Sequence, residues 1–137
     1  MATDSQTSVC QNAPIGLIDS GVGGLTIAKA IQQLLPHESI LYYADTAHLP
    51  YGNKSQSFIQ QRLMTIMHHL MAQGCKMIVV ACNSASAYLH TLPSIDVPCM
   101  GVIAPILDHL ELHHHPHAKI GLIGTHATIA SLAYVKQ

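Results

Sequence analysis

The sequence predicts an α/β protein in which helices cover both faces of a parallel sheet. Short apolar runs alternate with longer segments whose apolar side chains recur every three or four residues, the period of an amphipathic helix. Residues 76–81 are apolar on both faces, as a central strand of a parallel sheet must be. A glycine-rich turn joins the first apolar run to the first periodic segment. This alternation of strands and helices is typical of a parallel sheet between two helical layers.

The first two elements are a strand and a helix. Residues 15–18 form a short buried strand that stops at Asp19. The helix begins near Leu25 and ends at Pro36, because proline cannot continue a helix. Its apolar stripe contains Ile27, Ile31, Leu34 and Leu35.

A second strand at 39–44 leads into a loop at 45–53 and then into a longer helix. Ser55 or Ser57 is the expected N-cap of this helix, and Gly74 is the expected left-handed residue after its end. Its inward-facing side chains are Ile59, Leu63, Ile66, Met67 and Leu70.

The later segments continue the alternation. In order, they predict a strand at 76–81, a short helix at 83–89, an apolar segment at 97–102 broken by Pro98, a helix at 103–112, a strand at 119–124 and a helix from His126. We divide the chain into a flexible tail (1–13), a first α/β domain (14–100) and the start of a second domain (101–137). Because the last helix reaches Gln137 without a capping residue, we expect the chain to be part of a longer protein.

The composition argues against several classes of protein. The chain has 137 residues, of which 49% are apolar and 9% charged, so it can bury a large core. Six Lys+Arg against seven Asp+Glu give a net charge of -1, which argues against binding to nucleic acid or to a membrane surface. Its apolar runs are shorter than the ~18 residues of a membrane-spanning helix, and its N-terminus lacks a secretion signal. We therefore expect a cytoplasmic protein.

Three strand ends carry residues that are capable of chemistry. Residues 19–24 follow the first strand, residues 45–52 follow the second, and Cys82, Asn83 and Ser84 follow the third. Ligands of parallel α/β sheets bind at the carboxyl ends of the strands. We therefore expect these segments to meet in one crevice.

The glycine turn after the first strand has two interpretations. Its backbone N–H groups at a helix N-terminus suit a carboxylate or a phosphate, or its glycines serve tight packing alone. The dinucleotide fingerprint fails at Thr26, and Val22 and Gly23 replace the Lys-Ser/Thr of a phosphate loop. A nucleotide- or phosphate-binding domain is kept as the alternative function.

Cys82 is the strongest candidate for a reactive side chain. It ends a buried strand immediately before a short helix, whose N-terminus favours the thiolate over the thiol. The alternative is an inert buried cysteine, which is our interpretation of Cys75 and Cys99, whereas Cys10 is an exposed thiol of the tail. The eleven histidines, including the run at 113–117, are interpreted as solvated or packing residues, and no metal site is predicted.

The motifs at these strand ends resemble those of glutamate racemases. The matching segments are IGLIDSGVGGL at 15–25, PYG at 50–52, VVACNSAS at 79–86, GVI at 101–103 and GLIGTHATIASLAY at 121–134. The resemblance implies two similar α/β domains that face each other, of which this chain holds the first, incomplete, and the beginning of the second. It also implies interconversion of L- and D-glutamate without a cofactor, which supplies D-glutamate for peptidoglycan.

The same resemblance implies the site residues. Cys82 would be the base on one face of the α-carbon, and Asp19 would assist its proton transfer or bind the substrate ammonium. The implied substrate-binding residues are Asp19, Ser20, Tyr51, Gly52, Asn83 and Ser84, the last of which replaces the family's usual threonine. The family's second catalytic cysteine belongs to a later half, so we expect this chain not to racemise glutamate efficiently alone. We also expect it to self-associate through exposed apolar surface.

Overall fold

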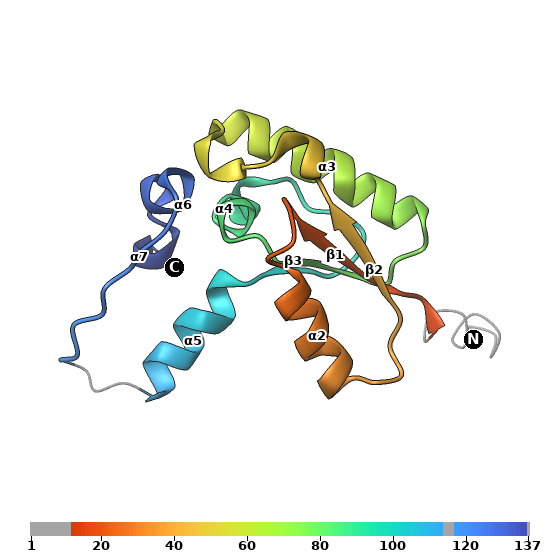
Figure 1. Ribbon diagram of the computed structural model, residues 1–137, viewed down its shortest axis with the longest axis horizontal. Coiled ribbons are helices and arrows are strands. Elements are labelled where there is room, and N and C mark those ends of the chain that lie inside the picture. The colour runs from red at the N-terminus through yellow and green to blue at the C-terminus, as the bar shows by residue number, and fades with distance from the viewer. Residues whose placement is uncertain (1–11, 114–116, 137) are drawn as a thin grey trace.

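Four parallel strands form the centre of the computed structural model, which describes residues 12–113 and 117–136 (Figure 1). The strands are β1 (Ile15–Asp19), β2 (Ile40–Ala44), β3 (Met77–Val80) and β4 (Cys99–Gly101), in the spatial order β2-β1-β3-β4. Each neighbouring pair is parallel. The predicted parallel α/β sheet is confirmed.

Helices of very different length connect and follow these strands. They are α2 (Leu25–Leu34), α3 (Gln56–Ala72), α4 (Asn83–Ser86), α5 (Ile103–His113), α6 (His126–Ser131) and α7 (Ala133–Lys136), with 3-10 turns η1 (Thr46–His48), η2 (Tyr51–Asn53) and η3 (Leu89–Thr91). Figure 1 shows α2 and α3 on opposite sides of the sheet. The helix predicted at 83–89 is shorter than expected, because α4 has 4 residues and gives way to η3.

Alternation along the strands divides the core into two clusters, one on each face of the sheet. Successive side chains of a strand point to opposite faces. One cluster joins Ile15, Leu17, Val79 and Ala81 to Ile27, Ala28 and Ile31 of α2. The other joins Ile18, Ile78 and Val80 to Ile59, Leu63, Ile66, Met67 and Leu70 of α3.

α3 anchors the larger of the two clusters. All of its predicted inward side chains are buried, whereas the side chains of α2 are half-buried or exposed. The Oγ of Ser55 accepts a hydrogen bond from the Phe58 N–H (3.3 Å), which confirms Ser55 as the N-cap. Gly74 follows the helix with a φ of +79°, as predicted for a left-handed residue.

The strand predicted at 119–124 is wrong. This segment has no regular secondary structure, pairs with no strand among the described residues, and leaves Ile123 fully exposed. An apolar run becomes a strand only beside a partner that takes up its backbone hydrogen bonds. The helix predicted from His126 is confirmed, but Leu132, with a left-handed φ of +57°, separates α6 from α7.

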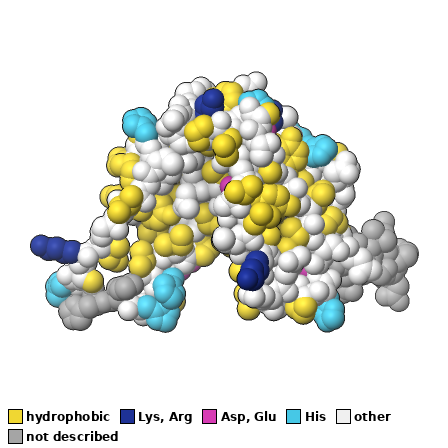
Figure 2. All heavy atoms as spheres, viewed as in Figure 1, with side chains coloured by type: hydrophobic (Ala, Val, Ile, Leu, Met, Phe, Trp, Pro, Cys, Tyr) yellow, Lys and Arg dark blue, Asp and Glu magenta, His cyan; other side chains and the backbone are white. Residues whose placement is uncertain are grey.

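Large apolar side chains are exposed mainly in the later part of the chain. They include Met100, Ile106, Leu112, Ile120, Leu122, Ile123, Ile129, Leu132 and Val135. Figure 2 shows hydrophobic side chains along the hollow at the lower edge of the molecule. The predicted tail at 1–13 lies outside the described residues except for its last two positions. Within the described ranges, no helix combines the length and hydropathy needed to cross a membrane.

Burial predicts different costs for the same substitution at a core position and at an exposed position. Leu63→Ala removes a fully buried side chain from α3 and should lower the free energy of unfolding by about 2–5 kcal/mol. The matched variant Leu34→Ala in α2 changes a side chain that is 80% exposed and should cost less than about 0.5 kcal/mol. Urea denaturation of both variants measures the difference, and equal losses would contradict this description of the core.

Candidate active site

The ends of β1 and β3 lie side by side and bring two predicted site residues together. Ile18 is the register partner of Val80, and the Ala81 N–H donates to the Ile18 carbonyl at 2.8 Å. Two residues further along each segment, just beyond the strands, the Ser20 Oγ lies 3.5 Å from the Cys82 Sγ. The structure therefore brings Asp19, Ser20 and Cys82, all predicted site residues, to one edge of the sheet.

The carboxylate of Asp19 is held by its own glycine turn. Its Oδ2 accepts hydrogen bonds from the Gly21 N–H (3.2 Å), the Gly24 N–H (2.9 Å) and the Tyr42 hydroxyl (3.1 Å). The turn therefore binds an anion, but the anion is the buried Asp19 side chain itself. These two N–H groups are not free for a phosphate, which counts against the nucleotide-binding alternative.

Tyr42 is a site residue that sequence reasoning missed. Its hydroxyl also lies 3.1 Å from the Gly21 carbonyl, so it contacts both the Asp19 carboxylate and the backbone of the glycine turn. Burial, together with the negative charge of Asp19, raises the pKa of Tyr42 to about 12, so its hydroxyl keeps its proton. The requirement for glycine at 24 is steric, because a Cβ there would lie 2.8 Å from the Asp19 Cβ and 2.9 Å from the Tyr42 hydroxyl.

A cluster of hydroxyl groups lies beyond Cys82. The Ser84 Oγ is 2.8 Å from the Thr125 Oγ1 and 3.5 Å from the Thr128 Oγ1, and the two threonine oxygens are 3.0 Å apart. Asn83 is linked to the same part of the chain, because its Oδ1 accepts a hydrogen bond from the Tyr134 hydroxyl at 2.6 Å. Predicted residues of α4 thus meet the segment that carries α6 and α7.

Thr125 and Thr128 were not identified from the sequence. The feature of the sequence that could have identified them is the Thr-x-x-Thr spacing at the start of a helix, where the first threonine is the N-cap. The Thr125 Oγ1 indeed accepts a hydrogen bond from the Thr128 N–H at 3.3 Å. Nothing in the sequence indicated that this cap would dock against Ser84, since 41 positions separate the two residues.

Tyr51 and Gly52 belong to the turn η2, in the loop that follows β2. This turn lies against α4, the helix that follows Cys82. The Tyr51 side chain is 1% exposed, and its hydroxyl donates to the Asp45 Oδ2 at 2.5 Å. A Cβ on Gly52 would lie 2.5 Å from the Thr125 Cβ, so only glycine fits against α6 here. The structure places the Tyr51 hydroxyl on Asp45, whereas Gly52 borders the hydroxyl cluster.

Asp45 is the centre of a second polar network. Its carboxylate accepts two hydrogen bonds from Arg62, Nε to Oδ2 at 3.0 Å and Nη2 to Oδ1 at 2.9 Å, and the His48 Nδ1 lies 2.9 Å from Oδ1. Burial alone would raise the pKa of Asp45. The hydrogen bonds from Arg62, Tyr51 and His48 outweigh burial and lower the pKa to about 2.

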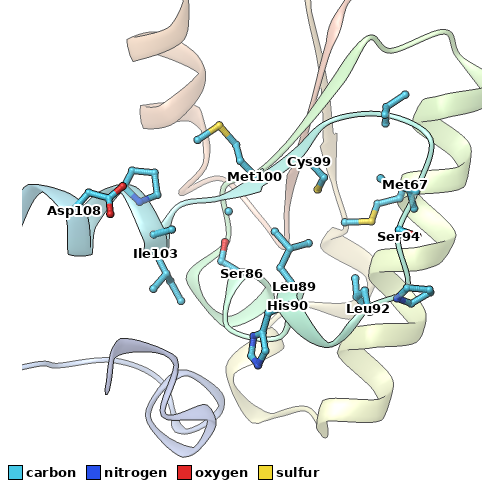
Figure 3. Close-up of a pocket in the computed structure, with 16 residues that line it drawn as sticks. Met67, Ser86, Leu89, His90, Leu92, Ser94, Cys99, Met100, Ile103 and Asp108 are labelled. Atoms are coloured by element: carbon cyan, nitrogen blue, oxygen red, sulfur yellow. The ribbon is translucent and has the colours of Figure 1, made fainter. Parts of the chain in front are cut away.

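A mainly apolar cavity lies away from these residues (Figure 3). It has a volume of about 600 Å³ and opens between η3, β4 and the start of α5. Its lining is mainly apolar and includes Met67, Leu92, Cys99, Met100 and Ile103, while Ser86 connects it to α4. The predicted site residues therefore do not line this cavity, and Asp19, Cys82 and Ser84 are buried at the edge of the sheet.

The remaining cysteines among the described residues stand apart from the candidate site. Burial raises the pKa of the Cys75 thiol, and it raises that of Cys99 to about 11, which suits packing rather than reaction at neutral pH. Cys10 and His114–His115 lie outside the described residues. Across the described part of the chain, no three His, Cys, Asp or Glu side chains gather as metal ligands would.

Known proteins match almost the whole chain. Residues 15–137 match the family model described as Asp/Glu/Hydantoin racemase. The chain is 48% identical over 126 residues to a glutamate racemase of Acidothermus cellulolyticus, covering 90% of this chain and 48% of that protein. It is 46% identical over 124 residues to a glutamate racemase of Thermus thermophilus, covering 89% and 47%.

Solved structures give the same result. The glutamate racemase from Thermus thermophilus in complex with β-chloro-D-alanine superposes with a TM-score of 0.82 at 45% identity, covering 90% of this chain and 47% of that one. The glutamate racemase from Francisella tularensis in complex with D-glutamate gives a TM-score of 0.81 at 38% identity, covering 90% and 46%. The chain spans about half the length of the relatives that it matches.

The Asp45 network predicts an acid-dependent loss of stability. The pKa of Asp45 is about 2 in the folded protein against 3.8 for an unperturbed carboxyl, so the folded state favours the ionised form. This contribution is complete above about pH 4 and is lost as the pH falls toward 2.

Urea denaturation of the wild type and of Asp45→Asn between pH 5 and about pH 2 tests this prediction. The difference in unfolding free energy between the two proteins should shrink as the pH falls, because the variant has no carboxyl at this position to protonate. A difference that stays constant over this range would contradict the assignment.

Proposed function

The chain belongs to the Asp/Glu/hydantoin racemase family, and we propose that it supplies one half of the active site of a cofactor-independent glutamate racemase. The observation that carries the proposal is the approach of Cys82 to the Asp19–Ser20 segment at one edge of the sheet. The relatives named glutamate racemase support glutamate as the substrate. The product, D-glutamate, serves peptidoglycan synthesis in the cytoplasm.

The proposed reaction begins with removal of the α-proton of glutamate. The Cys82 thiolate takes this proton, so the C–H bond breaks as an S–H bond forms, and the electron pair moves into the substrate α-carboxylate. An acid on the opposite face of the α-carbon then returns a proton. Cys75 and Cys99 are unsuited to this second role, since Cys75 precedes β3 and so lies at the opposite edge of the sheet from Cys82, and Cys99 lines the separate cavity.

The α-proton of an amino acid is a weak acid, so the site must stabilise the developing negative charge. We assign this task to the polar side chains that follow Cys82 in α4 and to the threonines that contact them. The hydroxyls of Ser84, Thr125 and Thr128 can donate to a carboxylate, and Asn83 has its amide nitrogen available because its Oδ1 is bound to Tyr134. Ser20 contacts the sulfur, and we assign to the neighbouring Asp19 the binding of the substrate ammonium.

The second acid is proposed to come from the part of the longer relatives that this chain does not match. Racemisation needs a group that transfers a proton on each face of the α-carbon. Among the described residues, we assign such a group, Cys82, to one face only. We therefore propose that the chain alone exchanges the α-hydrogen of one enantiomer with solvent but does not interconvert the two enantiomers efficiently.

Deuterium exchange tests this proposal. In D2O, the chain should exchange the α-hydrogen of one glutamate enantiomer with retention of configuration, because proton removal and return occur on the same face. Proton NMR follows the exchange, and chiral chromatography follows the configuration. Cys82→Ala should abolish exchange, whereas Cys99→Ala should preserve it.

Two outcomes would contradict the proposal. Exchange that persists in Cys82→Ala would remove Cys82 from the role of base. Rapid interconversion of L- and D-glutamate by the wild-type chain would show that a second acid lies within these 137 residues.

A further inference from the structure

We propose that Arg62 is a positioning residue, which acts through Asp45 and Tyr51 to hold the η2 turn against the hydroxyl cluster at Thr125. The helix α3 thereby controls the geometry of α6, although neither Arg62 nor Asp45 contacts that cluster. Figure 1 shows the start of α6 beside the loop that precedes α3. The effect that we expect Arg62 to have on glutamate binding rests on the function proposed above.

The first of the contacts that link Arg62 to Thr125 is the pairing of Arg62 with Asp45. The guanidinium presents Nε and Nη2 to the two carboxylate oxygens at 3.0 and 2.9 Å, a bidentate geometry that fixes the plane and the direction of the carboxylate. The Asp45 side chain is 4% exposed, so water cannot replace these donors readily. A lysine would keep the charge but would lose the planar fork.

The second step passes from Asp45 to the η2 turn. The oxygen that accepts from the Arg62 Nε also accepts from the Tyr51 hydroxyl at 2.5 Å. The phenol ring of Tyr51 is fully enclosed in the core, so this hydrogen bond and its packing set the position of the turn. A shift of the Asp45 carboxylate therefore moves Tyr51 and, with it, Gly52.

The third step is steric. Gly52 lies so close to Thr125 that an added Cβ would approach the Thr125 Cβ to 2.5 Å and Cγ2 to 2.6 Å. Thr125 caps α6 and contacts the Ser84 Oγ at 2.8 Å, two residues after Cys82. The η2 turn thus supports the hydroxyl cluster from behind, and displacement of such groups by about 1 Å reduces rates as much as a hundredfold.

A purely structural role for the same pair makes a different prediction. If the ion pair of Arg62 with Asp45 served stability alone, weakening it would favour global unfolding. Hydrogen exchange would then become faster in the amides of the sheet and in those of α6 together. A positioning role loosens α6 locally and leaves β1 and β3 protected. Amide hydrogen exchange separates the two roles because it reports each segment independently.

Two conservative variants and one control test the proposal. Arg62→Lys keeps the positive charge, and Tyr51→Phe keeps the buried ring while it removes the link to Asp45. Both should speed exchange of the hydrogen-bonded amides of Thr128 and Ile129 by about tenfold and leave the β1 and β3 amides unchanged. The control Lys76→Met removes the ion pair of Lys76 Nζ with Glu38 Oε2 (2.5 Å) near the other ends of these strands and should leave α6 exchange unchanged.

Glutamate binding provides the second readout. Calorimetric titration of L- and D-glutamate into the same proteins should show affinities at least about tenfold weaker in Arg62→Lys and Tyr51→Phe than in the wild type and Lys76→Met. Unchanged α6 exchange in both variants, or equal acceleration in α6 and the sheet, would overturn the positioning role. A wild-type chain that binds no glutamate would overturn the proposed function, while the exchange result would still decide the role of Arg62.

Discussion

The parallel pairing of β1 with β3 is the constraint on which the candidate site depends. Because the two strands run in the same direction and in register, their carboxyl ends deliver Ser20 and Cys82 to one point of the sheet edge. Side chains that are 62 positions apart in the chain meet there, just beyond the ends of the two strands. The packing of α3 beneath Ile18, Ile78 and Val80 keeps these two strands in place.

Much of this arrangement could be predicted from the sequence, because it follows from local patterns. Apolar periodicity located the four strands of the sheet, the Ser55 cap and Gly74 located the ends of α3, and the rule for strand ends predicted that the segment after β1 meets Cys82, as Ser20 does. The strand expected at 119–124 failed because an apolar run does not reveal whether a partner strand lies beside it.

The residues that sequence reasoning missed are those whose roles arise from tertiary contacts. Tyr42 looks like any aromatic residue of a strand until the fold places its hydroxyl on Asp19. Thr125 looks like a helix cap, and Arg62 like a solvated residue of α3, until η2 connects them. The glycine turn illustrates the same limit, because its N–H groups suggested an external anion but bind the carboxylate of Asp19.

The most direct measurement of the central claim is the rate at which iodoacetamide alkylates each cysteine, followed by mass spectrometry with and without glutamate. Cys82 should react faster than Cys75 and Cys99 near neutral pH, because burial raises the pKa of those two thiols, to about 11 for Cys99. Saturating glutamate should protect Cys82 and leave the other rates unchanged. A Cys82 thiol that reacts as slowly as Cys75, or that glutamate does not protect, would contradict its assignment as the base of the reaction.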